Sequence, residues 1–224
     1  MTFFYVFFAA IALVHLYACY FYMDKLRLVT KPMLLASLAV FYILAAHSIN
    51  GFVLAALLCG LIGDVFLMLP FNDRNFMLGA GIFGIGHLLY AVAVYTRLFA
   101  SGAAFSPWLV LFIALPYLAT IVLTGVRLMP HIENRFIRAN IPVYFALIAV
   151  HSVGAWLLLI HTSNAGGSVS GAAQMVLGGA LFFISDAILV RGLFVKENKK
   201  MNFYVMLTYI AAQFLLCRGF LGAL

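Results

Sequence analysis

The sequence predicts an all-α, polytopic membrane protein, a bundle of eight transmembrane helices that forms a single integral membrane domain over residues 1–224. Hydrophobic residues make up 67% of the chain and charged residues only 8%, whereas soluble domains carry roughly 25% charged residues. The mean hydropathy is +1.15. With 13 basic and 6 acidic residues, the chain has too few charges for a water-facing surface, which excludes a soluble globular domain.

Helices are favoured over a β-barrel by the first apolar segment. Barrel strands alternate apolar and polar residues over about ten positions. The segment from Phe3 to Tyr22 shows no such alternation, because its even-numbered and odd-numbered positions are both mostly apolar. A spanning helix needs about 20 apolar residues. Charged residues, Gly/Ser/Asn clusters and prolines divide the chain into eight spans of this kind, which we place at residues 3–23, 32–48, 51–69, 77–96, 107–125, 139–161, 172–194 and 203–223.

Local signals support these spans in order. The first lacks a basic n-region and exceeds the roughly 7–15 apolar residues of a signal peptide, so we expect it to be retained. The second opens at Thr30-Lys31-Pro32, and only the turn His47–Gly51 divides it from the third. Basic residues separate the fifth span from the sixth and the seventh from the eighth, and the fourth and eighth contain polar pairs described below.

The basic residues predict the orientation. Eleven of the 13 flank the odd-numbered loops: Lys25, Arg27, Lys31, Arg74, Arg127, Arg135, Arg138, Arg191, Lys196, Lys199 and Lys200. Only Arg97 and Arg218 lie on the other side. Because cytoplasmic loops carry the Lys/Arg excess, we expect both termini outside and a location in the bacterial inner (plasma) membrane. Topology and contact with anionic lipid explain the net charge of +7, so no nucleic-acid partner is expected.

Two of the six acids are out of place. Asp24, Asp73, Glu133 and Glu197 lie in loops, but Asp64 and Asp186 are flanked by apolar residues inside the third and seventh spans. An ionised Asp at a helix centre costs about 2.5–3.5 kcal/mol. Both spans run in the same direction, and each acid lies roughly 7–12 Å below the cytoplasmic boundary at about 1.5 Å per residue. The two carboxyls are therefore expected to share a site, the alternative being that each only fixes helix packing.

Two polar pairs lie at a similar depth. His87 and Tyr90 are three residues apart on the fourth span, and Tyr209 and Gln213 are four apart on the eighth, so each pair shares a helix face. Both pairs have an alternative role in helix packing. Each follows an acid-bearing span, which is a weak internal repeat and would fit a parallel 4+4 duplication. Glycines near the acids and on the fourth span, among them Gly63, are expected to let the helices approach closely.

A set of short motifs, taken together, resembles a known family. They are Thr30-Lys31-Pro32, Gly63-Asp64-x-x-Leu67, Gly86-His87-x-x-Tyr90, Pro142-Val143-Tyr144, Gly179-Ala180-Leu181-Phe182-x-x-Ser185-Asp186 and Tyr209-x-x-x-Gln213. Their order and spacing are similar to those of the YhhN-type membrane proteins, which include the lysoplasmalogenases. The resemblance covers nearly the whole chain. It implies eight helices, hydrolysis of the vinyl-ether bond of lysoplasmalogens to a fatty aldehyde and a glycerophospho-base, and catalysis by the two intramembrane aspartates, here Asp64 and Asp186.

The chemistry fits this implication. Vinyl-ether hydrolysis needs an acid that protonates the β-carbon and an anion that stabilises the resulting oxocarbenium ion; two buried carboxyls supply both, because proximity disfavours double ionisation. The sequence leaves open which Asp has which role. His87, Tyr90, Tyr144, Tyr209 and Gln213 are candidates for supporting the site, and Lys31 for the substrate phosphate. A lysophospholipid substrate and membrane lipid are the expected partners, with no cofactor and no metal.

Three alternatives stay open. An intramembrane aspartyl protease also pairs two aspartates, but here Asp64 follows Ile-Gly, Asp186 follows Ser, and no Pro-Ala-Leu sequence occurs. A proton-coupled transporter would use the aspartates as carriers. A metal hydrolase is disfavoured because the six histidines show no HExxH or paired spacing. Aldehyde release by purified protein, proton-driven uptake and sensitivity to chelators separate these classes.

Overall fold

The structure is a computed structural model that describes residues 2–195 and 200–223, and over these ranges it is helical with no β-strand. The helices are α1 (Thr2–Tyr20), α2 (Asp24–Ala45), α3 (Gly51–Met68), α4 (Asp73–Ala100), α5 (Pro107–Leu128), α6 (Arg135–Asn164), α7 (Ser170–Phe194) and α8 (Met201–Ala223), with a 3₁₀ turn at Met129–His131. Each of the eight is long and apolar enough to cross a membrane. The predicted fold class is confirmed, and the chain is a multi-pass integral membrane protein.

The predicted spans match the eight helices, and the largest difference is at the start of α2. The sequence places this start at Pro32, but α2 begins at Asp24 and contains Pro32 in its interior. Charged residues mark the limit of the apolar segment without ending the helix, which continues into the interface. The predicted boundary between the second and third spans, at the turn His47–Gly51, is correct. Asn50 caps α3, and its side-chain oxygen accepts from the backbone N–H of Phe52 at 3.0 Å.

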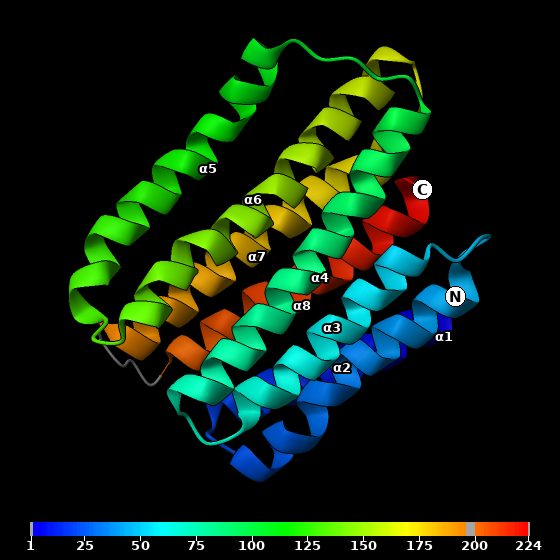
Figure 1. Cartoon of the computed structure of the whole chain (residues 1–224). Coiled ribbons are helices and arrows are strands. Elements are labelled where there is room, and N and C mark those ends of the chain that lie inside the picture. Colours follow the sequence, from blue (N-terminus) through cyan, green and yellow to red (C-terminus); the bar gives the residue numbers. More distant parts are fainter. Residues whose placement is uncertain (1, 196–199, 224) are drawn as a thin grey trace.

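The helices alternate in direction, so that the even-numbered ones all begin at one end of the bundle (Figure 1). Both ends of the drawn chain lie at the opposite end. Arg27, Arg74 and Arg135 are therefore on the same side, as the charge distribution predicts; the sidedness relative to the cell stays a prediction. Lys196, Lys199 and Glu197, which also entered that reasoning, lie outside the described residues.

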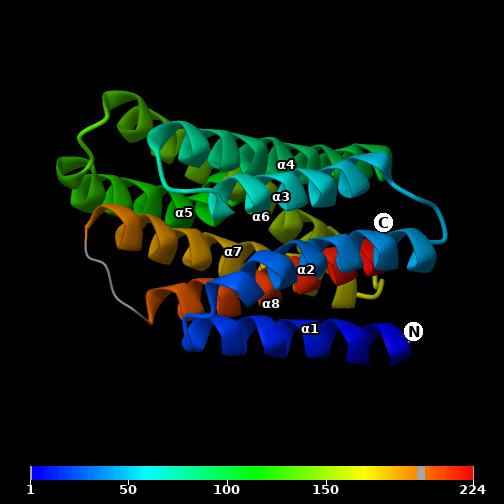
Figure 2. The same ribbon diagram turned by 90° about the horizontal axis from the view of Figure 1, so that it is seen from below.

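Neighbouring contacts arrange the helices around a common interior. Successive helices pack together from α1 to α4, α4 then packs against α6, and α6, α7 and α8 lead back to α1 and α2. Figure 2 shows α3 and α4 on one side and α1, α2 and α8 on the other. Helix α5 packs on the outside of α6, and Gly125 and Leu128 are its only buried residues. The interior is thus formed by the other helices.

Some helix contacts resemble the predicted internal repeat, although the duplication itself stays a prediction. Each acid-bearing helix, α3 or α7, packs closely on the helix that follows it, and the contact of α4 with α6 corresponds to that of α8 with α2. The contact of α1 with α8 has no counterpart of similar extent between α5 and α4.

Glycine brings α3 and α4 together next to Asp64. A Cβ atom at Gly63 would lie 2.7 Å from the ring of Phe83 and 3.2 Å from the carbonyl oxygen of Gly79. The predicted close approach therefore occurs at this pair, and it sets the position of Asp64 against α4. Gly81, by contrast, has nothing within 4 Å of the position that a Cβ would occupy.

We expect Gly63→Ala to lower the thermal stability of the protein in detergent. The added methyl group overlaps Phe83 and approaches the α4 backbone, and overpacking costs about 1–3 kcal/mol. Gly81→Ala is the matched control: it meets open space and gains up to about 1 kcal/mol of helix propensity. Unfolding followed by a thiol-reactive or light-scattering assay compares the two, and equal midpoints would contradict the close packing.

Candidate active site

A cavity of about 660 Å³ opens into the bundle between α2, α3, α4, α6, α7 and α8. Its walls are mostly apolar, with Leu67, Phe83 and Val190 among the lining side chains. Both intramembrane aspartates line it, although only 1% of Asp64 and 6% of Asp186 is exposed. The structure therefore brings together the two carboxyls that the sequence placed at similar depth.

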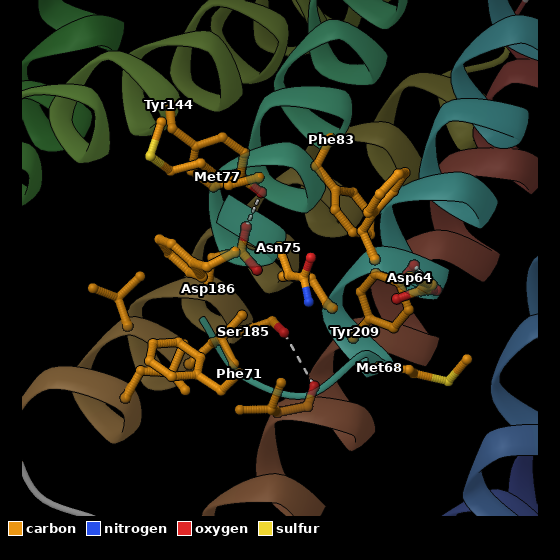
Figure 3. Close-up of a pocket in the computed structure, with 18 of the residues that line it drawn as sticks. Asp64, Met68, Phe71, Asn75, Met77, Phe83, Tyr144, Ser185, Asp186 and Tyr209 are labelled. Atoms are coloured by element: carbon orange, nitrogen blue, oxygen red, sulfur yellow. Dashed lines mark hydrogen bonds between the residues drawn. The ribbon is translucent and has the colours of Figure 1, made fainter. Parts of the chain in front are cut away.

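Asp64 is held by two polar side chains from other helices. Lys31 of α2 places its ammonium nitrogen 3.0 Å from Oδ1, and the hydroxyl of Tyr209 on α8 donates to Oδ2 at 2.6 Å. Figure 3 shows Tyr209 beside Asp64. The Lys31 side chain is itself only 15% exposed. An ammonium in direct contact stabilises the ionised carboxylate, and the phenol donor does so as well.

Asp186 has a different partner. The hydroxyl of Tyr144 on α6 donates to its Oδ2, as Figure 3 shows. The neighbouring Ser185 donates to the backbone oxygen of Val205 at 3.0 Å, which fixes α7 against α8 at this level. The carboxyl of Asp186 thus lies in an apolar wall with a neutral phenol as its hydrogen-bond partner.

The two carboxyls are therefore chemically unlike. Asp64 forms an ion pair, whereas no cation contacts Asp186 among the residues that the structure describes. Removal from water and a nearby anion both favour the neutral form of a carboxylic acid. The site accordingly combines one carboxyl paired with an ammonium and one whose hydrogen-bond partner is a neutral phenol.

The remaining predicted residues divide into two groups. Tyr144 and Tyr209 line the cavity and bind the carboxyls, and Gln213 stands behind Tyr209, its amide nitrogen 3.5 Å from the Tyr209 oxygen. His87 and Tyr90 are buried in a separate cluster with His151, their ring centroids 5.5 to 6.2 Å apart. Neither is among the residues found to line the cavity. Their sequence spacing shows a shared face without showing what that face contacts.

This second cluster, His87, Tyr90 and His151, contains polar atoms without partners. Nδ1 of His87, the hydroxyl of Tyr90 and both ring nitrogens of His151 are buried and make no hydrogen bond in the structure. Nothing in the spacing of the sequence places His151, on α6, beside His87 on α4. Through His87 the cluster borders the site, because the ring of His87 lies against that of Tyr144 with centroids 6.4 Å apart, although none of the three residues is among those found to line the cavity.

The ion pair between Lys31 and Asp64 is the feature that sequence reasoning missed. Lys31 was predicted to lie at the cytoplasmic edge and to meet the substrate phosphate. The earlier start of α2 places it inside the helix, where its side chain reaches Asp64. Its position directly before Pro32, where the apolar segment begins, was the available signal.

Comparison with known proteins gives one match. The model of the YhhN family matches residues 26–220, a range that contains both aspartates and all their partners. The match confirms the resemblance carried by the sequence motifs. No curated protein and no solved structure is significantly similar to the chain.

We expect Lys31→Met to destabilise the protein by about 3–5 kcal/mol, because it leaves the Asp64 carboxylate buried without its cation. Adding Asp64→Asn should restore part of the loss, since a neutral amide needs no counter-charge. Thermal unfolding of the two single variants and the double variant gives the coupling energy. Additive effects would contradict a direct pair.

Replacing Tyr90 by Phe should leave stability unchanged or slightly increased, because it removes a buried hydroxyl that has no partner. Tyr209→Phe makes the same chemical change but removes the 2.6 Å bond to Asp64, so it should lower stability by about 1–3 kcal/mol. The two variants serve as each other's control in one unfolding experiment. Equal losses would show that Tyr90 has a partner equivalent to Asp64.

Proposed function

Since the chain belongs to the YhhN family, we propose that it is a lysoplasmalogenase-like hydrolase. It cleaves the vinyl-ether bond of a lysoplasmalogen and releases a fatty aldehyde and glycerophospho-ethanolamine or glycerophospho-choline. The observation that carries the proposal is the pair of buried carboxyls with unlike partners on one cavity: Lys31 and Tyr209 bind Asp64, and Tyr144 binds Asp186.

The cavity suits a lipid with one chain. A volume of about 660 Å³ with mostly apolar walls accommodates a single alkenyl chain. The carboxyls lie a few residues from the ends of α3 and α7 that the charge distribution predicts to be cytoplasmic, four before Met68 and eight before Phe194. The reactive bond of a lysophospholipid lies just below its head group, so a lipid anchored at that boundary presents this bond at the level of the carboxyls.

The first step uses the neutral acid. Asp186 transfers its proton to the β-carbon of the vinyl ether, and the electron pair of the C=C bond forms the new C–H bond. The products of this step are an oxocarbenium ion and an Asp186 carboxylate. Tyr144 stabilises the new carboxylate by the hydrogen bond that it already donates. Asp64, already ionised, adds a second negative charge near the developing cation, as carboxylates do in glycosidases.

The second step uses the anion and water. Asp64 takes a proton from water as the oxygen attacks the oxocarbenium carbon, which yields a hemiacetal. The hemiacetal collapses when Asp186 accepts its hydroxyl proton and Asp64 returns a proton to the departing glycerol oxygen. Both carboxyls are then back in their starting forms, so the cycle needs water as its only co-reactant. Lys31, 3.0 Å from Asp64, pairs with the carboxylate to which this residue returns at the end of the cycle.

We expect Asp64→Asn and Asp186→Asn each to reduce fatty-aldehyde release from lysoplasmalogen by about 100- to 10,000-fold, the range of general acid–base catalysis. Asp73→Asn, on an exposed helix start, is the control and should retain activity. The measurement is an aldehyde assay on purified protein in detergent, with unfolding midpoints to show that the variants are folded. Full activity of either Asn variant would refute the assignment.

Deuterium labelling tests the chemistry directly. In D₂O, proton transfer to the β-carbon places one deuterium on the carbon next to the aldehyde group, and mass spectrometry of the product detects it. An unlabelled aldehyde would contradict protonation by a solvent-exchangeable acid.

Uptake into proteoliposomes tests the transporter alternative. Uptake driven by a proton gradient, without aldehyde release, would favour the transporter over the hydrolase.

A further inference from the structure

One end of the cavity is polar. Asp24 and Arg27 lie in the first turn of α2, Asn75 in the first turn of α4, and Asn140 and Asn202 near the starts of α6 and α8, and all five line the cavity. The even-numbered helices begin at the same end of the bundle (Figure 1), so these five residues form one rim, here called the polar mouth. The two carboxyls lie deeper, beyond Lys31.

Arg27 is the cation of the polar mouth, and its charge is only weakly compensated. Lys31, one turn further along the same face of α2, is engaged by Asp64 at 3.0 Å. Arg27 contacts Asp24 at 3.0 Å, but the Asp24 side chain is 81% exposed, and exposed ion pairs of this kind are weak. Its other partner is neutral: with its amide oxygen turned toward the guanidinium, Asn202 accepts from Nη1 at 3.0 Å.

The Arg27 side chain is suited to a phosphate. It is 29% exposed and lines the cavity. A planar guanidinium binds two oxygens of one phosphate better than an ammonium does. The neighbouring Asp24 carboxylate, largely exposed at the same rim, complements a cationic amine. Positive and negative groups side by side match a zwitterionic head group.

The spacing along α2 agrees with the dimensions of the substrate. Arg27 and Lys31 are four residues apart, about 6 Å along the helix axis. In a lysoplasmalogen only the glycerol carbons separate the ether oxygen from the phosphate. A lipid whose vinyl ether is next to the carboxyls therefore extends its phosphate toward Arg27.

We propose that Arg27 binds the phosphodiester of the lysophospholipid head group, with Asp24 next to the ethanolamine or choline ammonium. This assignment rests on the proposed function and moves phosphate binding from Lys31, which sequence reasoning favoured, to the residue one turn before it. Lys31 pairs with the Asp64 carboxyl, and Arg27 binds the phosphate of the head group. Arg27 is thus a substrate-binding residue that sets head-group specificity and takes no part in proton transfer.

A binding experiment tests the proposal separately from catalysis. The probes are lysophosphatidylethanolamine, whose acyl ester replaces the vinyl ether, and a monoacylglycerol with the same chain and no phosphate. We expect Arg27→Gln to weaken binding of the phospholipid roughly tenfold or more, the loss of charge-assisted hydrogen bonds, and to leave binding of the monoacylglycerol unchanged. The affinity of Arg27→Lys for the phospholipid should lie between those of the wild type and Arg27→Gln, because lysine keeps the positive charge but lacks the planar guanidinium that binds two oxygens at once.

The matched control is Arg74→Gln, an exposed cation in the first turn of α4 that is not among the cavity-lining residues. It should bind both probes as the wild type does. The site is refuted if Arg27→Gln binds the phospholipid with wild-type affinity, loses affinity for both probes equally, or behaves as Arg74→Gln does.

In turnover assays, Arg27→Gln should raise KM and leave kcat within about threefold. A wild-type protein that binds the phospholipid and releases no aldehyde would reject the hydrolase while leaving this binding site intact.

Discussion

The ion pair between Lys31 and Asp64 is the interaction on which the rest of the site depends. A carboxylate within a membrane-spanning helix is unfavourable unless a cation meets it, and Lys31 does so at 3.0 Å from a side chain that is almost as buried. The pair requires α2 to lie against α3 with Lys31 facing inward. Asp186 lines the same cavity without a cation in contact with it among the described residues, and its hydrogen-bond partner is the phenol of Tyr144.

The fold could be predicted from the sequence almost entirely. Few charges, long apolar segments and the asymmetric distribution of Arg and Lys depend on local composition, and they were sufficient to place eight helices and the common end of the even-numbered ones. The start of α2 was missed because a charged segment followed by proline resembles a helix start, whereas the helix in fact continues through both.

The site could be predicted only in part. Asp64 and Asp186 were conspicuous because the cost of burying a charge is a property of each position alone. Their partners depend on which helices meet and in which rotation, which spacing along one helix does not determine. For this reason Tyr209 and His87, both members of polar pairs at a similar depth, have different surroundings: Tyr209 donates to Asp64, while His87 lies in a cluster with unpaired atoms. For the same reason Lys31, which was expected to meet the substrate phosphate, instead pairs with Asp64.

Proline lies beside the partner of each aspartate. Pro32 follows Lys31 directly on α2, and Pro142 lies two residues before Tyr144 on α6. Because proline has no N–H, the carbonyl groups of Leu28 and Arg138, four residues earlier, lose their usual helical hydrogen bonds. Each helix is therefore less stiff where its terminal segment joins the core. The ends of α2 and α6 that border the cavity are therefore joined to the rest of each helix by fewer backbone hydrogen bonds, with Lys31 inside this weakened turn of α2 and Tyr144 on the core side of the one in α6.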